Sequence, residues 1–177
     1  MRRCTTALMA ELNFWKWRKR VKYPVPVLLL IFAAVVPTPA HAESWAVYNE
    51  DKCRLEYASS VFNRGAINSE KFQQFSGPDK HTYFRVKGLP NEEKWSPRKI
   101  RSEYVKEKGA ADVVYERTKR DFLVLSGYRG QNIFYTKIAL SPDNETICVL
   151  HISYPRKAKR AFDAIVTRMS RSFTAEN

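Results

Sequence analysis

Three strand candidates lie in FLVLSGYRGQNIFYTKIALSPDNETICVLHISY, residues 122–154, and they decide the fold. They are predicted at 121–129, 132–140 and 145–154. The residues between them, Arg129-Gly130 and Pro142-Asp143-Asn144, are typical of turns. Turns this short leave no room for a crossover helix, so the strands are expected to run antiparallel as a meander. The last candidate is apolar on both faces, which is typical of a central strand covered on both sides.

Shorter strand candidates precede this run. They are predicted at 45–48, 53–57, 71–75, 82–86 and 112–117, and the last of these is expected to be the first strand of the meander. The weak pattern of 58–70 is interpreted as a loop, and Ser76-Gly77-Pro78-Asp79 as the turn of a hairpin. A helix is expected from the N-cap Ser96 to Gly109, because Pro97 fits the first helical position and Gly fits the end.

A second helix is predicted beyond Pro155, and it is strongly amphipathic. Apolar residues recur at helical spacing on one side: Ala161, Phe162, Ile165, Val166, Met169 and Phe173. A step of about 100° per residue puts a basic stripe on the opposite side: Lys157, Arg160, Arg168 and Arg171. These elements together indicate an α+β fold, with a single antiparallel sheet of about five to seven strands and two packed helices.

The N-terminal segment has the features of a secretory signal peptide. The apolar run Val25–Val36 is shorter than the roughly 20 residues that span a bilayer, and a basic block at 16–22 precedes it. Ala40-His41-Ala42 supplies the small-x-small pattern of a cleavage site. We therefore expect residues 1–42 to be removed and 43–177 to form a single α+β domain, periplasmic or secreted, in a bacterium. An uncleaved membrane anchor is the alternative.

Composition and cysteine count both change without this segment. It carries seven of the 31 Lys and Arg residues and one of the 18 Asp and Glu, so residues 43–177 hold 24 basic and 17 acidic side chains. This moderate basic excess favours acidic partners, and no nucleic-acid partner is expected. Cys53 and Cys148 remain, and in an oxidising compartment such a pair usually forms a disulfide. Two separate buried thiols are the alternative.

The chain also resembles a secreted domain of alphaproteobacteria. The matching residues are Trp45, Tyr48, Leu125-Ser126-Gly127-Tyr128-Arg129-Gly130, Phe134-Tyr135, Tyr154-Pro155 and Arg171-Ser172-Phe173. Tyr48 is followed directly by Asn49, and three residues separate Gly130 from Phe134, so both motifs depart from the pattern. The layout of such domains is similar to the PsbP-like α/β/α sandwich of extrinsic, partner-docking proteins. The resemblance implies a fold and an exported protein, but no chemistry.

The sequence offers little for catalysis. His81 and His151 are far apart, so neither a metal site nor a cofactor is expected. Cys148 and His151 are three apart on a strand and would point to opposite faces. Ser126 lacks the flanking glycines and the following helix of a nucleophile elbow. We expect His151 to be a hydrogen-bonded residue against the sheet, and the strand aromatics to pack sheet and helices together. An exposed aromatic ladder that binds bases or sugars is the alternative for those aromatics.

Two functions remain open. The first is a non-enzymatic periplasmic domain that docks on an envelope protein or on an anionic lipid or lipopolysaccharide surface, with the basic stripe as its contact. The stripe can also be an ordinary solvated face. The second is a periplasmic hydrolase or redox enzyme with an unrecognised site, built from Ser126, His151 and acidic loop residues. The first is favoured because no cluster of titratable groups is visible.

Overall fold

The computed structural model describes residues 43–177 apart from 70–71 and 109–112. The predicted signal peptide, residues 1–42, and its cleavage after Ala42 lie outside the described residues, as does Gly109.

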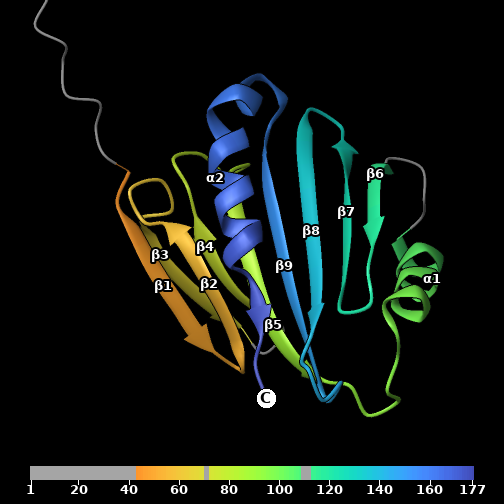
Figure 1. The fold of residues 1–177 in the computed structure, drawn as a ribbon. Helices are drawn as coiled ribbons and strands as arrows, with labels where there is room; N and C mark the ends of the chain where they lie inside the picture. The colour runs from red at the N-terminus through yellow and green to blue at the C-terminus, as the bar shows by residue number, and fades with distance from the viewer. Residues whose placement is uncertain (1–42, 70–71, 109–112) are drawn as a thin grey trace, which may run out of the picture. The chain divides into compact units, whose positions relative to one another are not determined.

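Seven strands form a large sheet in the order β3-β4-β5-β9-β8-β7-β6, and every neighbouring pair is antiparallel (Figure 1). They are β3 (Arg64–Ser69), β4 (Phe72–Ser76), β5 (Tyr83–Pro90), β6 (Val113–Thr118), β7 (Phe122–Arg129), β8 (Asn132–Leu140) and β9 (Thr146–Pro155). The predicted meander is confirmed as β6 to β9. The tight turn between β7 and β8 uses the positive φ of 58° at Gly130, which glycine adopts without steric cost. The doubly apolar β9 lies in the middle of the sheet, between β5 and β8.

A second sheet of three strands has the order β1-β2-β10, so the prediction of a single sheet was wrong. It consists of β1 (Trp45–Glu50), β2 (Cys53–Ala58) and β10 (Thr174–Ala175). The turn between β1 and β2 has positive φ at Asp51 and Lys52, and it lies so close to β5 that a Cβ at Gly88 would meet the Asp51 carbonyl. The hairpin of β1 and β2 therefore lies across the face of the large sheet. The alternation of apolar and polar residues along its strands would be the same if the hairpin lay at the edge of that sheet, so the sequence did not distinguish the two positions.

Strand β3 also differs from the prediction, because 58–70 was interpreted as a loop. It pairs only with β4, at the edge of the large sheet, with a register shift between Arg64 and Ala66. An edge strand of this kind is held through backbone hydrogen bonds and needs little apolar alternation. The sequence pattern therefore gave no signal for it.

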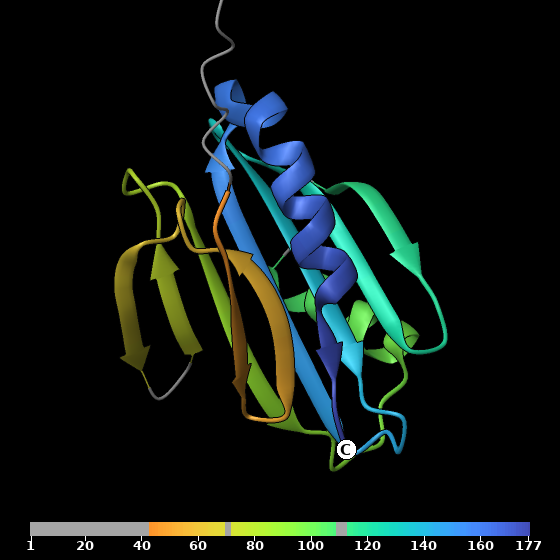
Figure 2. The ribbon, with the colours of Figure 1, turned by 60° about the vertical axis from the view of Figure 1, so that its left-hand side comes forward.

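The helices cover opposite faces of the large sheet (Figures 1 and 2). The C-terminal helix α2 (Lys159–Ser172), preceded by the 3₁₀ turn η1 (Arg156–Ala158), lies beside the small sheet on one face. Helix α1 (Pro97–Lys108) covers part of the other face, over β7 and β8. Ser96 caps α1 as predicted, since its Oγ accepts a hydrogen bond from the Lys99 amide at 3.4 Å. The α+β class with two helices is confirmed.

The predicted apolar side of α2 is buried except at Ala161, which is exposed. Phe162, Ile165, Val166 and Met169 lie in the larger of two cores, between α2, the small sheet and the large sheet. The ring of Phe162 stacks on Tyr154 of β9 with centroids 4.8 Å apart. Packing of this kind fixes which side of α2 faces outward.

Cys53 and Cys148 lie at disulfide distance, with Cα atoms 5.7 Å apart, and both are fully buried. Cys53 begins β2 and Cys148 belongs to β9, so the bond joins the small sheet to the centre of the large one.

Candidate functional site

The four basic residues of the predicted stripe all lie on the exposed side of the C-terminal helix segment. Lys157 belongs to η1, and Arg160, Arg168 and Arg171 belong to α2. From Arg160 to Arg171 the stripe extends about 16 Å along the helix axis, at a rise of about 1.5 Å per residue. We call this surface, together with Ala164 and Thr167 between the basic residues, the α2 face.

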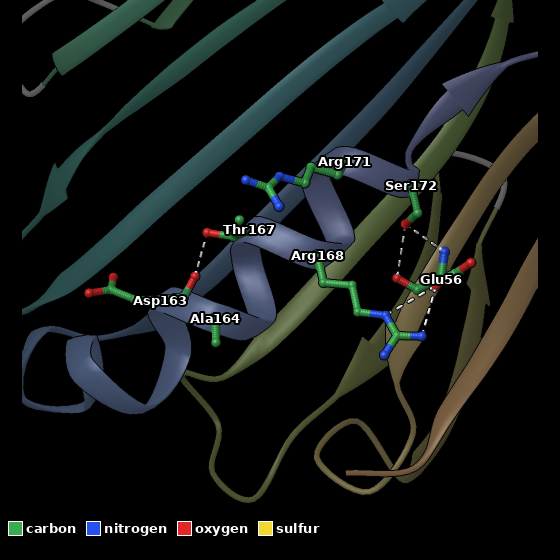
Figure 3. A pocket seen from close by; sticks show the side chains of 7 residues that line it. All are labelled: Glu56, Asp163, Ala164, Thr167, Arg168, Arg171 and Ser172. Carbon is green, nitrogen blue, oxygen red and sulfur yellow. Dashed lines mark hydrogen bonds and ion pairs between the residues drawn. The ribbon is translucent and has the colours of Figure 1, made fainter.

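Arg168 differs from the other three because it has partners inside the domain. Its Nε and Nη2 donate hydrogen bonds of 3.1 and 3.0 Å to the same carboxylate oxygen of Glu56 on β2 (Figure 3). Its guanidinium also lies 4.0 Å from the ring centroid of Trp45 on β1. Arg168 therefore links α2 to the small sheet, and its charge is partly matched by Glu56.

The remaining cations of the α2 face are unmatched. In the described part of the chain, no carboxylate pairs with Lys157, Arg160 or Arg171. A further internal ion pair, Lys159 with Asp163 at 2.8 Å, lies on the side of the helix next to the face. The side chain of Arg171 points away from the Arg168–Glu56 pair in Figure 3.

A shallow hollow of about 770 Å³ lies on the α2 face (Figure 3). Its lining includes the small side chains of Ala164 and Thr167 and the two arginines Arg168 and Arg171. Thr167 satisfies its hydroxyl within the helix, by a hydrogen bond of 2.7 Å to the Asp163 carbonyl. Glu56, Asp163 and Ser172 complete the lining, so the hollow presents small side chains in the middle with both cations and carboxylates around them.

A second, smaller groove of about 330 Å³ borders the face on its other side, between α2 and the edge strand β6. Val114 and Tyr115 of β6 line it and are 66% and 50% exposed. They extend the α2 face with an apolar margin.

Two side chains of β8 support α2 from beneath, and the sequence pattern did not reveal them. Lys137 Nζ donates hydrogen bonds to the carbonyls of Ser170 and Phe173 at 2.8 and 2.9 Å. Tyr135 shares a hydrogen bond of 2.5 Å with Ser170 Oγ. Burial lowers the pKa of Lys137 and raises that of Tyr135 relative to their ordinary values. The end of α2, which carries Arg171, is thereby held in place.

The residues considered for catalysis are not brought together. Ser126 faces the α2 side of the large sheet and donates a hydrogen bond of 2.8 Å to the Phe134 carbonyl. His151 is on the opposite face, and Cys148 is buried at the disulfide. A catalytic pair of Ser126 with His151, or of Cys148 with His151, is therefore excluded by the sheet between them. Within the described ranges, no group of three or more His, Cys, Asp or Glu side chains could hold a metal ion.

His151 is hydrogen-bonded, as expected. Its Nδ1 lies 2.9 Å from the hydroxyl of Thr136 on the neighbouring strand. Burial, and then the positive charges of Arg129 and Arg85, lower its pKa from 6.5 to about 4, so it is uncharged near neutral pH.

Most strand aromatics pack in the cores, as the sequence predicted. Phe75 and Phe84 stack with centroids 4.5 Å apart, and Tyr57 lies tilted against both. Tyr115 is the clearest departure, since half of it is exposed.

The fold is similar to that of proteins with solved structures. The cyanobacterial PsbP protein CyanoP of Synechocystis sp. PCC 6803 is similar over 78% of this chain and 96% of its own, with a TM-score of 0.58 and 8% identity. The chain has a PsbP-like fold. The Ran-binding protein Mog1p of Saccharomyces cerevisiae matches over 75% of this chain and 95% of its own, with a TM-score of 0.49 and 8% identity. No family model and no curated protein matches the sequence. At 8% identity, the likeness to CyanoP concerns the fold alone.

Proposed function

We propose that the protein is an exported, non-enzymatic domain that docks through the α2 face on an acidic surface of an envelope protein. Export is inferred from the signal-like segment 1–42, and the buried cysteine pair and the PsbP-like fold are compatible with it. No helix in the part of the chain that the structure describes is long and apolar enough to cross a bilayer.

The observation that carries the proposal is a set of three unmatched cations on the helix segment that bears the hollow, of which Arg171 also lines the hollow. Lys157, Arg160 and Arg171 project from a helix whose opposite side is fixed in the core. A partner that places carboxylates between them gains charge-assisted hydrogen bonds without displacing an internal ion pair. Binding should cost little further conformational freedom in the helix, because Lys137 and the core already hold it in place.

The shape of the face favours a protein over a lipid surface. Ala164 and Thr167 leave a hollow that a protruding segment can fill, whereas a flat layer of headgroups needs none. Helices that lie in a membrane interface bury large apolar side chains, but the α2 face has only small ones between its cations. The exposed Val114 and Tyr115 beside the hollow provide the apolar contact that protein interfaces contain.

The experiment compares capture of envelope proteins by three forms of the exported protein. The first is the wild type, and the second carries Lys157→Glu, Arg160→Glu and Arg171→Glu. Arg168 is left in place because it holds Glu56. The third is a matched control with Lys80→Glu, Arg98→Glu and Lys119→Glu, three exposed cations outside α2 that have no ion pair in the described residues. All three substitutions in each variant are at exposed positions, so both variants should fold.

We expect the wild type and the control to capture the same protein, and the α2 variant to lose it. Added salt should weaken the capture, because screening shortens to about 8 Å at physiological ionic strength. Equal loss in both variants would attribute binding to net charge and contradict the proposal. Binding of the wild type to phosphatidylglycerol vesicles without any captured protein would favour the lipid alternative instead.

A further inference from the structure

A basic and aromatic pocket lies on the opposite face of the large sheet, where α1 leaves part of that face uncovered. Its volume is about 520 Å³, within the usual range of small-molecule sites, about 300–1,000 Å³. Strands β4, β5, β7, β8 and β9 line it, and Tyr104 of α1 closes one side. It shares no lining residue with the hollow on the α2 face.

Three cations line the pocket, and no acidic side chain does. Arg85 and Lys87 come from β5, and Arg129 comes from the end of β7. Among the described residues, none of the three pairs with a carboxylate. The Nε of Arg85 donates a hydrogen bond of 2.7 Å to Gln74, which fixes the guanidinium while leaving its positive charge unneutralised.

At the cationic end of the pocket, the two arginine guanidinium groups lie over aromatic rings. The Arg85 guanidinium lies 4.3 Å from the ring centroid of Phe72 and 4.7 Å from that of Tyr83. The guanidinium of Arg129 lies 5.8 Å from the centroid of Phe134. Stacked guanidinium groups lose little freedom when they bind an anion, since their orientation is already set.

The polar floor lies between these two arginines. Arg85, His151 and Thr136 are paired in one row across β5, β9 and β8. The Thr136 hydroxyl and His151 Nδ1 share a hydrogen bond of 2.9 Å, so the floor offers neutral polar groups.

The other end of the pocket is apolar. In the next row on this face, Lys87 of β5 is paired with Val149 of β9, and Leu89 lies two residues beyond Lys87 on β5. From Arg85 to Leu89 the strand rises about 13 Å, at about 3.3 Å per residue. Leu89, Val149 and Tyr104 line this end. Apart from Lys87, which is paired with Val149, the pocket thus changes from cationic to apolar along the strand direction.

We propose that this pocket binds a small amphiphilic anion, with a carboxylate or phosphate head between Arg85 and Arg129 and an apolar body against Val149, Leu89 and Tyr104. Both heads match the guanidinium fork. The length of about 13 Å from Arg85 to Leu89 corresponds to a medium-length acyl chain.

The test is a titration of the ¹⁵N-labelled exported protein followed by its amide NMR spectrum. The probes are decanoate, decyl phosphate, uncharged decanol and inorganic phosphate. We expect saturable shifts at Arg85, Val149 and His151 with at least one of the two amphiphilic anions. Decanol and inorganic phosphate should each bind at least about tenfold more weakly than that anion. The tighter of the two anions identifies the head.

Arg85→Gln with Arg129→Gln should weaken binding of that anion about tenfold or more, since each loses a charge-assisted contact. Leu89→Ser should weaken it while leaving the cations intact. The matched control Lys119→Gln with Arg120→Gln, in the exposed turn between β6 and β7, should bind as the wild type does. Dispersed spectra show that each variant is folded. Shifts confined to another surface, equal binding of decanol, or unchanged binding by the arginine variant would overturn the proposal.

Discussion

Lys137 of β8 donates a hydrogen bond of 2.8 Å to the carbonyl oxygen of Ser170, in the last turn of α2. A second hydrogen bond of 2.9 Å reaches the Phe173 carbonyl, just beyond the helix. The last carbonyls of a helix have no partner within it and carry partial negative charge. The Lys137 side chain therefore caps the C-terminal end of α2 and fixes the turn that carries Arg171.

Replacement of this cation should destabilise the domain. Lys137→Met keeps the length of the side chain but leaves two half-buried carbonyls without their donor, at a cost of about 1–3 kcal/mol. Urea unfolding of both proteins measures the difference. Lys119→Met at an exposed position should change the free energy of unfolding by less than about 0.5 kcal/mol. If both variants behaved alike, the hydrogen bonds of Lys137 would contribute nothing to stability.

The burial of Phe162 gives a second stability prediction. Its ring stacks on Tyr154 and lies in the larger core, so Phe162→Ala should lower the free energy of unfolding by about 3–5 kcal/mol. The same urea experiment measures it. A loss below about 1 kcal/mol would mean that α2 is not packed on the sheet as described.

The cysteine pair gives a third prediction about stability. A bond that closes a loop of 95 residues stabilises by up to about 4–5 kcal/mol in the chain-entropy model. Cys53→Ala with Cys148→Ala should therefore unfold at markedly lower urea concentration than the oxidised wild type. A reducing agent should lower the stability of the wild type and leave the double variant unchanged. An equal response of both proteins would show that the cysteines are not bonded.

His151 predicts a dependence of stability on pH. Its pKa of about 4 in the folded protein lies below the ordinary 6.5, so the unfolded chain binds more protons between these values. Stability is therefore fully present above about pH 6.5 and is lost as the pH falls toward 4, by up to about 3 kcal/mol. His151→Gln should remove this part of the pH dependence, measured as the difference between the two unfolding curves across that range. Parallel curves would contradict the burial of an uncharged imidazole.

Local patterns predicted much of this structure. The turn residues after Arg129 and in 142–144 fixed the meander, and the spacing of Phe162, Ile165 and Met169 fixed the buried side of α2. These features follow from neighbours in sequence. The second sheet does not, because β1 and β2 pair with each other whether they lie at an edge or across a face.

The candidate site was predicted only in part. Exposure of the basic stripe follows from helical geometry, but the pairing of Arg168 with Glu56 joins residues 112 positions apart. Lys137 looks like any other polar residue of a strand until its position beneath α2 is known. The pocket of Arg85 and Arg129 needs the register of five strands, which no short window of sequence contains.

Contact at Ala164, in the middle of the α2 face, tests the docking account most directly. Ala164→p-benzoylphenylalanine places a photoreactive group in the hollow, and Glu92→p-benzoylphenylalanine places the same group in an exposed loop before α1. Illumination of cells that export the two variants, followed by mass spectrometry, identifies what each position touches. Docking through the α2 face predicts a protein adduct at Ala164 that is absent at Glu92 and is lost when Arg160→Glu and Arg171→Glu are added. The account is contradicted by an adduct that persists with both arginines reversed, by the same adduct at Glu92, or by none at Ala164.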